Sequence, residues 1–228
     1  MHSFLQIPQG EVPIYVAESF VDSNVSVLVL PAIFGIDQDV EELCDEIAGL
    51  GANAIAVDPF WEVDPGPLSH SFEDVRRALD RKNKVGTQRG IDLALEYCKT
   101  LRSPPEKLIA LGICYGGHLA FIAAAKGLVD GAVILHGGGL TDYVRFISDI
   151  QVPLSIHFGD QDSLIPMDDV LLLQEGFAEV PHVDIQVYEG ARHGFSHQSS
   201  LSFHQEAYMG SLNGLDSMIG HLSEEQGV

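Results

Sequence analysis

A cysteine flanked by glycines is the clearest chemical signal in this sequence. An apolar stretch runs into Gly112-Ile113-Cys114-Tyr115-Gly116, the Gly-x-nucleophile-x-Gly pattern of a nucleophile elbow with cysteine at the central position. The turn is so tight that side chains two residues before or after the nucleophile would collide with it, which explains both glycines. The pattern predicts that the Cys114 side chain projects above a strand–helix junction and acts as a nucleophile.

The helix expected after Cys114 favours this reactivity. A helix N-terminus presents free N–H groups and the positive end of the helix dipole, and both favour a thiolate and a developing oxyanion. The backbone N–H of Tyr115 is therefore a candidate donor of an oxyanion hole. A buried structural cysteine in a glycine-rich turn is the competing interpretation, since cysteine is often buried.

An acid and a histidine follow Cys114 along the chain. Asp162 comes just after one apolar run, and His193 lies between glycines in a loop after the last one. Nucleophile, acid and base occur in this order in the fold that carries the elbow, and active sites of parallel sheets form in loops past the carboxyl ends of strands. Asp160 is the rival acid, and a turn aspartate or a solvated loop histidine would explain either residue alone. The three in this order predict a triad of Cys114, His193 and Asp162.

Short apolar runs that alternate with amphipathic segments provide the frame for these residues. The runs lack polar alternation, as do strands covered by helices on both faces of a mostly parallel sheet. They are Val25–Leu30, Ala52–Val57, Leu108–Ile113, Ala132–Leu135, Leu154–Phe158 and Ile185–Tyr188. Helices are expected over Val40–Leu50, Gly90–Leu101, Tyr115–Lys126, Asp168–Ala178 and Leu201–His221, with a proline-rich loop over Trp61–His70. This alternation predicts a single α/β domain over residues 1–228.

The composition argues against several classes of protein. The chain has 12 Lys and Arg against 33 Asp and Glu, and a net charge of −21 repels nucleic acid and anionic lipid. No apolar run is long enough to span a membrane, and the first ten residues do not resemble a signal peptide. A cytoplasmic location is therefore the expectation. The acidic composition also raises the hypothesis of a salt-rich habitat.

The remaining cysteines and the histidine spacing do not indicate a disulfide or a metal. Cys44, Cys98 and Cys114 form an odd, small set that suits a reducing compartment and matches no zinc motif. Cys44 and Cys98 fall on expected helices and are assigned to the core. His193 and His197 are four residues apart, but no third ligand is near in sequence, so no metal is predicted.

Several segments together resemble the dienelactone hydrolase (carboxymethylenebutenolidase) family. They are Pro31–Ile36, Gly112–Gly117, Gly159–Asp162 with Pro166, His193–Phe195 and Val57–Phe60, and they span nearly the whole chain. The resemblance implies an α/β-hydrolase fold, hydrolysis of an ester or lactone by Cys114, His193 and Asp162, and no metal or organic cofactor. It also implies that the backbone N–H of Ile33 faces that of Tyr115 in the oxyanion hole.

Two positions depart from the family's pattern. The family typically has a glutamate directly before its Ile-Phe-Gly segment, through which substrate binding switches the thiol on, and this chain has Ala32. Family members that act on dienelactone carry an arginine after the catalytic histidine, and His197 stands there instead. Neutral imidazole binds a carboxylate far more weakly than guanidinium does. The reaction class therefore carries over better than the substrate.

Weaker candidates complete the expected site. The side chains assigned to the substrate pocket are Phe34, Trp61, His136, Phe195 and His197, with ordinary packing as the competing interpretation. Arg76, Arg77 and Arg81 could supply an anion clamp, although solvated helix charges are the favoured interpretation.

Three functions remain open at this stage. The first is a dienelactone-hydrolase-like enzyme that cleaves small esters or lactones through an acyl-thioester. The second is a broad carboxylesterase or thioesterase without dienelactone activity. The third is a non-catalytic binding protein on a hydrolase scaffold, because one fold serves many uses. A small ester or lactone is the expected partner, and a monomer is the default, with a homodimer left open.

Overall fold

The computed structural model describes residues 1–103 and 106–224, in which eight strands form one sheet with the order β1-β2-β4-β3-β5-β6-β7-β8. The strands are β1 (His2–Ile7), β2 (Gly10–Ala17), β3 (Val25–Leu30), β4 (Asn53–Val57), β5 (Lys107–Ile113), β6 (Gly131–Leu135), β7 (Leu154–Gly159) and β8 (Val183–Tyr188). The helices are α1 (Gln38–Gly49), α2 (Phe72–Val85), α3 (Thr87–Leu101), α4 (Tyr115–Ala125), the 3-10 helix η1 (Leu140–Asp149), α5 (Met167–Phe177) and α6 (Gln205–Glu224). β3 to β8 pair in parallel, whereas β1 and β2 are antiparallel at one edge.

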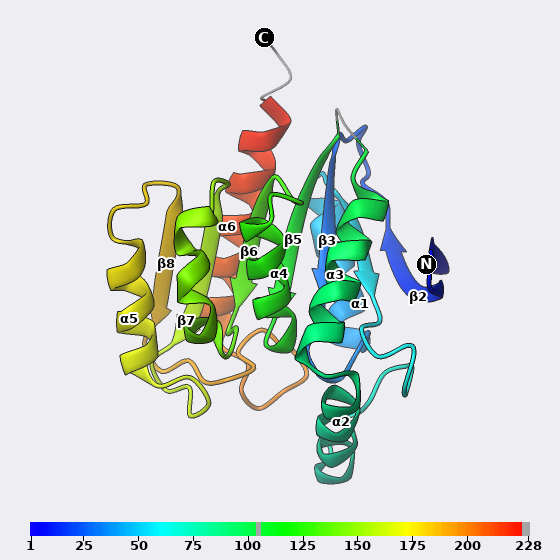
Figure 1. Ribbon diagram of the computed structural model, residues 1–228, viewed down its shortest axis with the longest axis horizontal. Helices are drawn as coiled ribbons and strands as arrows, with labels where there is room; N and C mark the ends of the chain where they lie inside the picture. The colour runs from blue at the N-terminus through cyan, green and yellow to red at the C-terminus, as the bar shows by residue number, and fades with distance from the viewer. Residues whose placement is uncertain (104–105, 225–228) are drawn as a thin grey trace.

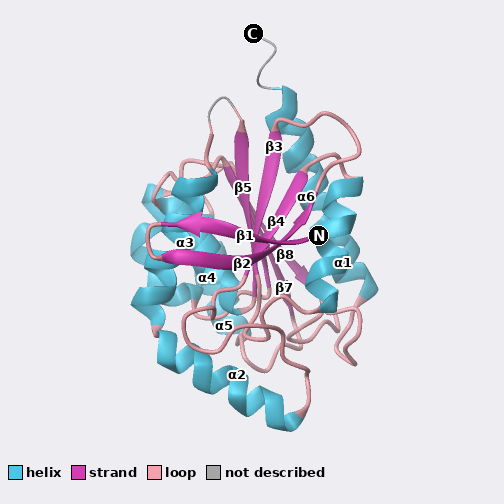
Figure 2. Cartoon of the chain, turned by 90° about the vertical axis from the view of Figure 1, so that its right-hand side faces the viewer, coloured by secondary structure: helices cyan, strands magenta, loops and turns pink. Residues whose placement is uncertain are grey.

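Helices cover both faces of the sheet. Figure 1 shows α3, α4 and α5 in front of the sheet and α1 and α6 behind it, and Figure 2 shows the two helical layers from the side. All residues of β6 and β7 are buried, which explains why these segments contain apolar runs without polar alternation. The prediction of a mostly parallel sheet between helical layers is confirmed.

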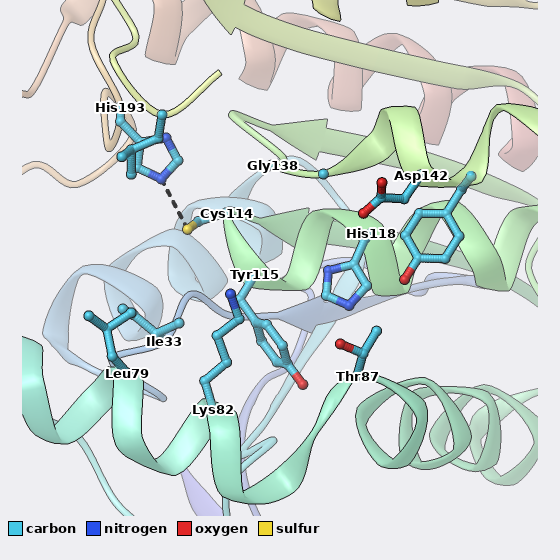
Figure 3. Close-up of a pocket in the computed structure, with 13 residues that line it drawn as sticks. Ile33, Leu79, Lys82, Thr87, Cys114, Tyr115, His118, Gly138, Asp142 and His193 are labelled. Atoms are coloured by element: carbon cyan, nitrogen blue, oxygen red, sulfur yellow. Dashed lines mark hydrogen bonds between the residues drawn. The ribbon is translucent and has the colours of Figure 1, made fainter. Parts of the chain in front are cut away.

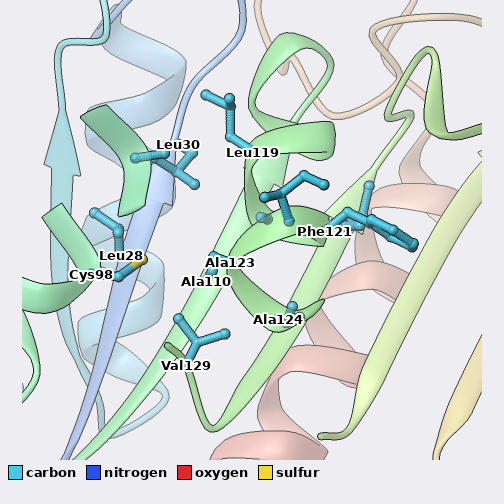
Figure 4. Close-up of a cluster of buried hydrophobic side chains, with 14 of the residues drawn as sticks. Leu28, Leu30, Cys98, Ala110, Leu119, Phe121, Ala123, Ala124 and Val129 are labelled. Carbon is cyan, nitrogen blue, oxygen red and sulfur yellow. The ribbon is translucent and has the colours of Figure 1, made fainter. Parts of the chain in front are cut away.

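Helix α4 is buried on all sides and packs directly on the sheet. Its small residues Ala123 and Ala124 lie in a core cluster with Leu28 and Leu30 of β3 (Figure 4). Small side chains allow the helix to approach the strands closely, and burial of a leucine contributes roughly 1.5–3 kcal/mol relative to exposure. This packing fixes the N-terminus of α4 at the carboxyl end of β5, where Cys114 lies.

Two regions were not anticipated from the sequence. The edge hairpin is only partly buried: β1 has a single buried residue, Ile7, and Pro13 interrupts the apolar residues of β2. Helix α2 consists mostly of charged residues and buries only Ala78, Arg81 and Val85, so few apolar residues mark it in the sequence. Ser71 begins α2 by accepting a hydrogen bond from the Asp74 N–H at 3.2 Å. In Figures 1 and 2, α2 extends beyond the sheet at the end where the parallel strands terminate.

Candidate active site

The backbone at Cys114 has the strained geometry that the glycine pattern predicted. Cys114 has φ 50° and ψ −104°, and its N–H donates to the Leu135 carbonyl at 3.0 Å. A Cβ added at Gly116 would lie 1.8 Å from the Leu30 carbonyl oxygen, and one at Gly112 would lie 2.3 Å from the Gly116 carbonyl oxygen. Only glycine fits at these two positions, so the tight packing of strand against helix holds Cys114 in an unfavourable conformation.

The fold brings the sulfur of Cys114, the imidazole of His193 and the carboxylate of Asp162 into line. His193 Nε2 lies 3.0 Å from Cys114 Sγ, as the dashed line in Figure 3 marks, and His193 Nδ1 lies 2.7 Å from Asp162 Oδ2. These side chains follow the carboxyl ends of β5, β7 and β8. Cys114 and His193 are 79 residues apart in the sequence. Nucleophile, base and orienting acid are therefore within hydrogen-bond reach of one another.

The two candidate acids have different partners. Asp162 has a fully buried side chain, and its Oδ1 accepts hydrogen bonds from the N–H groups of Leu164 and Ile165 at 2.8 and 3.2 Å. Asp160 instead accepts a hydrogen bond from the Gly190 N–H at 2.7 Å and contacts the loop backbone. The backbone donors hold the Asp162 carboxylate so that its second oxygen faces His193.

The neighbours of His193 favour its protonated form. Burial by itself lowers the pKa of His193, but the hydrogen bonds and charges of Asp162 and Cys114 outweigh it and raise this pKa to about 10. His193 is therefore a cation at neutral pH, with one N–H directed at Asp162 and the other at the sulfur. This arrangement can stabilise a thiolate at Cys114 in the resting protein.

Arg81 is buried, so the interpretation of Arg81 as a solvated helix charge was wrong. Its side chain is 1% exposed, its Nε and Nη2 donate to the Ile33 carbonyl, and its Nη1 donates to the carbonyls of Asp64 and Gly66. The guanidinium lies 4.3 Å above the Phe60 ring. Burial is tolerated because backbone oxygens satisfy the donors, which leaves Arg81 bound to the loop rather than free to clamp an anion.

A cavity of about 340 Å³ lies beside Cys114 and His193 (Figure 3). Its lining includes both residues whose backbone N–H groups were assigned to the oxyanion hole, Ile33 and Tyr115. The other lining residues are Leu79, Lys82, Thr87, His118, Gly138, Gly139, Asp142, Tyr143 and Leu164. Most of these come from α2, from the first turn of α4 and from the segment around η1, which the sequence did not connect with the site.

The side chains assigned to the substrate pocket are not among the residues that line this cavity, so their assignment stays a prediction. Phe34 stacks on His70 with ring centroids 4.1 Å apart, and Trp61 donates to the Tyr97 hydroxyl at 3.2 Å. Phe195 is fully buried in the core between α6 and the sheet.

His136 and His197 are also absent from the lining, although the ring of His136 lies 4.8 Å from the ring of His193. His136 has no exposed surface, and its Nε2 lies 2.8 Å from the Ser196 hydroxyl oxygen. His197 is 5% exposed, and its Nδ1 lies 3.7 Å from the carboxylate of Asp39. The residue that the sequence aligns with the family's arginine therefore faces an acid of its own chain.

Two groups of side chains have the donor atoms of a metal site. Cys114, His136 and His193 form one group, and Asp37, Asp39, His70 and His197 form the other, each with donor atoms within 4.8 Å of one another. The spacing of His193 and His197 is typical of some metal sites, but the structure places the two histidines in different groups. Hydrogen bonds within the described chain already engage most of these donors, including His70 with Asp37 at 3.1 Å.

Comparison with known proteins identifies the family. The sequence model of the Dienelactone hydrolase family matches residues 12–222. The chain belongs to this family. It is 29% identical over 185 residues to the carboxymethylenebutenolidase of Pseudomonas putida, covering 78% of this chain and 77% of that one. It is 28% identical over 187 residues to the human carboxymethylenebutenolidase homolog, covering 81% and 76% of the two chains.

Solved structures agree on the fold of this dienelactone hydrolase family member. A dienelactone hydrolase-like promiscuous phosphotriesterase from metagenomic libraries superposes with a TM-score of 0.78 at 19% identity, over 97% of this chain and 98% of that one. The predictions of family, α/β-hydrolase fold and ester-hydrolase class are confirmed. Within residues 1–103 and 106–224, no helix is long and apolar enough to cross a membrane.

Proposed function

We propose that the protein hydrolyses small esters or lactones with Cys114 as nucleophile, His193 as general base and acid, and Asp162 as the group that orients the histidine. The single observation that carries this proposal is the aligned geometry of the three side chains, 3.0 Å from Sγ to Nε2 and 2.7 Å from Nδ1 to the carboxylate. The cavity beside the sulfur and the strained elbow support it. The relatives' name, carboxymethylenebutenolidase, agrees with it.

In the first half of the reaction the Cys114 thiolate attacks the ester carbonyl carbon and the carbonyl π electrons move onto oxygen. The backbone N–H groups of Ile33 and Tyr115 receive this oxyanion, and loss of one such donor typically costs roughly a hundredfold or more in rate. Collapse of the intermediate breaks the bond to the leaving oxygen, which takes a proton from His193 Nε2. The acyl group remains on sulfur as a thioester.

In the second half the neutral His193 removes a proton from water, and the hydroxide attacks the thioester. The carboxylic acid leaves and the thiolate–imidazolium pair forms again. Asp162 stabilises the imidazolium and holds the tautomer throughout. Ala32 is 2% exposed and has no carboxylate, so activation of the thiol depends on His193 rather than on a glutamate released by substrate.

The test compares Cys114→Ala with the matched variant Cys98→Ala on a panel of p-nitrophenyl esters and lactones. Turnover is expected to disappear in Cys114→Ala and to persist in Cys98→Ala, because Cys98 is buried in the core. Cys114→Ser is expected to give a slow hydrolase or a trapped acyl-enzyme. Full turnover in Cys114→Ala would refute the proposal.

A second candidate is a carboxylesterase or thioesterase without dienelactone activity. The orientation of His197 toward Asp39 favours it, since the carboxylate of a dienelactone loses the partner that the family provides at this place. Adding a dienelactone and an acyl thioester to the panel separates the two candidates. Hydrolysis of simple esters with no measurable dienelactone turnover would support the second.

A further inference from the structure

Four side chains with metal-binding atoms lie together outside the proposed catalytic triad. They are Asp37, Asp39, His70 and His197, which form the loop cluster, and one donor atom of each lies within 4.8 Å of the others. Imidazole nitrogens and carboxylate oxygens are ligands of divalent first-row transition ions, Zn²⁺ among them. Two histidines and two carboxylates together supply the four donors of one tetrahedral ion, which an acidic patch alone does not.

The spacing of the donor atoms matches a single ion. His70 Nε2 lies 3.1 Å from Asp37 Oδ2, and His197 Nδ1 lies 3.7 Å from Asp39 Oδ2. Ligand atoms about 2.0–2.2 Å from a tetrahedral zinc ion lie roughly 3.3–3.6 Å from one another, which falls between the two observed distances. Without an ion, each histidine pairs with one carboxylate, and an ion among the four atoms would replace these pairs.

Backbone and hydroxyl groups hold both carboxylates in these orientations. Asp37 Oδ1 accepts a hydrogen bond from the Val40 N–H at 3.0 Å, while its Oδ2 faces His70. Asp39 Oδ1 accepts one from the Ser199 N–H at 3.0 Å, and Oδ2 accepts one from the Ser199 hydroxyl at 2.6 Å. Because a carboxylate oxygen has two lone pairs, Asp39 Oδ2 can keep the serine and bind an ion as well. Hydrogen bonds of this kind orient the ligands of metal sites.

Phe34 packs against both imidazoles of the loop cluster. Its ring stacks on His70 with centroids 4.1 Å apart and lies edge-on to His197 at 6.5 Å, and the two imidazole rings are 5.0 Å apart. The side chains of Asp39 and His197 are 6% exposed, whereas that of His70 is 30% exposed. Packing therefore keeps the donors in place, and solvent reaches them from the side of His70.

The loop cluster joins three segments that are far apart in the sequence. Its aspartates lie at the start of α1, shortly after Ile33, whose backbone N–H is assigned to the oxyanion hole. His70 lies just before α2, and His197 lies in the loop that carries His193. In Figure 1 this last loop, in orange, runs along the end of the sheet from which α2 extends. An ion held by all four ligands would tie these segments to one another.

We propose that the loop cluster binds one divalent transition-metal ion of the zinc type, with Asp37, Asp39, His70 and His197 as its ligands. The ion has a structural role, since it joins three loops and leaves the sulfur of Cys114 free to react. The proposal goes beyond the proposed hydrolysis and does not depend on it, because the loop cluster shares no residue with the triad.

Zinc titration of the full chain tests the site directly. After metals are removed with EDTA and dialysis, Zn²⁺ alone is titrated into the wild type in a calorimeter, and bound metal is measured after gel filtration. Zinc is expected to bind and to raise the melting temperature by about 5 °C or more when free Zn²⁺ is at about a hundredfold excess over its Kd. A wild type that retains no zinc and keeps its melting temperature would overturn the proposal.

Variants assign the ion to the loop cluster. Asp37→Asn keeps a residue type that caps a helix but removes the carboxylate, and His70→Ala removes the most exposed ligand. Each is expected to weaken Zn²⁺ binding about a hundredfold or more. The matched control is His2→Ala, which removes another contact of a histidine with a carboxylate, that of Glu41, and should keep the wild-type affinity. Wild-type affinity in both Asp37→Asn and His70→Ala would overturn the proposal.

Cobalt distinguishes the loop cluster from the other group of donors, which includes Cys114. The first equivalent of Co²⁺ is expected to give visible d–d absorption without the near-ultraviolet sulfur-to-cobalt band that a cysteine ligand adds. Cys114→Ala should bind Co²⁺ and Zn²⁺ as the wild type does. A sulfur-to-cobalt band in the first equivalent, or loss of zinc binding in Cys114→Ala, would place the ion at Cys114 and overturn the proposal.

Discussion

The carbonyl of Ile33 accepts hydrogen bonds from Nε and Nη2 of Arg81, at 3.0 and 2.8 Å. The third nitrogen of the same guanidinium donates to the carbonyls of Asp64 and Gly66 at 2.9 and 2.8 Å. Arg81 lies on α2, so one buried side chain ties this helix to the loop that brings the Ile33 backbone to the cavity. Arg81 is therefore a positioning residue for the proposed oxyanion hole.

Replacement of Arg81 by Met is expected to lower kcat about tenfold or more with little change in KM, because the Ile33 N–H no longer holds its place in the transition state. The free energy of unfolding should fall by about 3 kcal/mol or more, since three carbonyls lose their donors. Steady-state kinetics and urea unfolding measure the two effects. Arg77→Met, which removes an exposed ion pair with Asp64, is the control and should change stability by at most about 1 kcal/mol. A wild-type kcat in Arg81→Met would contradict the positioning role.

Gly116→Ala is expected to abolish activity and to destabilise the fold severely. The new methyl group would lie 1.8 Å from the Leu30 carbonyl oxygen. Because that oxygen belongs to the backbone, no side-chain rotation can relieve the contact. Gly220→Ala, in the exposed part of α6 with open space around it, is the matched control. It should raise the free energy of unfolding by about 0.5–1 kcal/mol, as helix propensity predicts. Thermal melting of both variants makes the comparison, and a stable, active Gly116→Ala protein would show that the elbow is not tight.

Asp39 should contribute stability that disappears in acid. Burial raises the pKa of Asp39, but hydrogen bonds with His197 and Ser199 outweigh burial and lower it from 3.8 to about 2. A carboxyl group whose pKa is lower in the folded state stabilises the protein above its ordinary pKa, and this contribution is lost as the pH falls from about 4 through about 2. We therefore expect wild type to lose about 1–2 kcal/mol over this interval in addition to the loss seen in Asp39→Asn.

Urea unfolding of both proteins at pH 2 to 7 tests the contribution of Asp39. The difference in free energy of unfolding between wild type and Asp39→Asn should be largest above pH 4 and should shrink toward pH 2. The matched control is Asp22→Asn, at an exposed position in the β2–β3 loop. A constant difference between wild type and Asp39→Asn across the whole interval would argue against the assignment.

Cys114 should react with iodoacetamide far faster than the other two cysteines. Burial raises the pKa of Cys44 and of Cys98 to about 12, whereas Cys114 is partly exposed and lies beside a protonated His193. We expect a rate at least about a hundredfold higher for Cys114, because its sulfur is accessible and faces the imidazolium of His193.

Mass spectrometry of the labelled peptides measures these rates. His193→Gln is expected to remove most of the labelling at pH 6 and less of it at pH 9, where an isolated thiol also ionises. Slow labelling of all three cysteines at similar rates would support a non-catalytic role for Cys114.

Much of the fold was predictable because its signals are local. The apolar runs that become β3 and β5 to β7 are buried on both faces, so each shows its environment in its own composition. Gly112 and Gly116 are required by contacts within the turn and with an adjacent strand, so they also appear as a short pattern. The edge hairpin and α2 were missed because the hairpin is only partly buried and α2 consists mostly of charged residues, so few apolar residues mark either element.

The lining of the site was not predictable in the same way. Arg81 resembles the exposed arginines beside it, and only its position over the loop carbonyls makes it a buried residue. His118 follows Cys114 by one helical turn, which could have indicated a place near the sulfur, but its position in the lining depends on packing against Tyr115 and Tyr143.

The sequence by itself determined the chemistry that could occur at Cys114: the elbow, the chain order of acid and histidine, and the family. These features rest on residue types and short spacings, which a linear chain displays directly. The tertiary structure alone decided the 3.0 Å contact of His193 with the sulfur, the pairing of His193 with Asp162 rather than Asp160, and the residues that line the cavity. Those relations join segments far apart along the chain, and only the packing of the helices on the sheet brings them within contact distance.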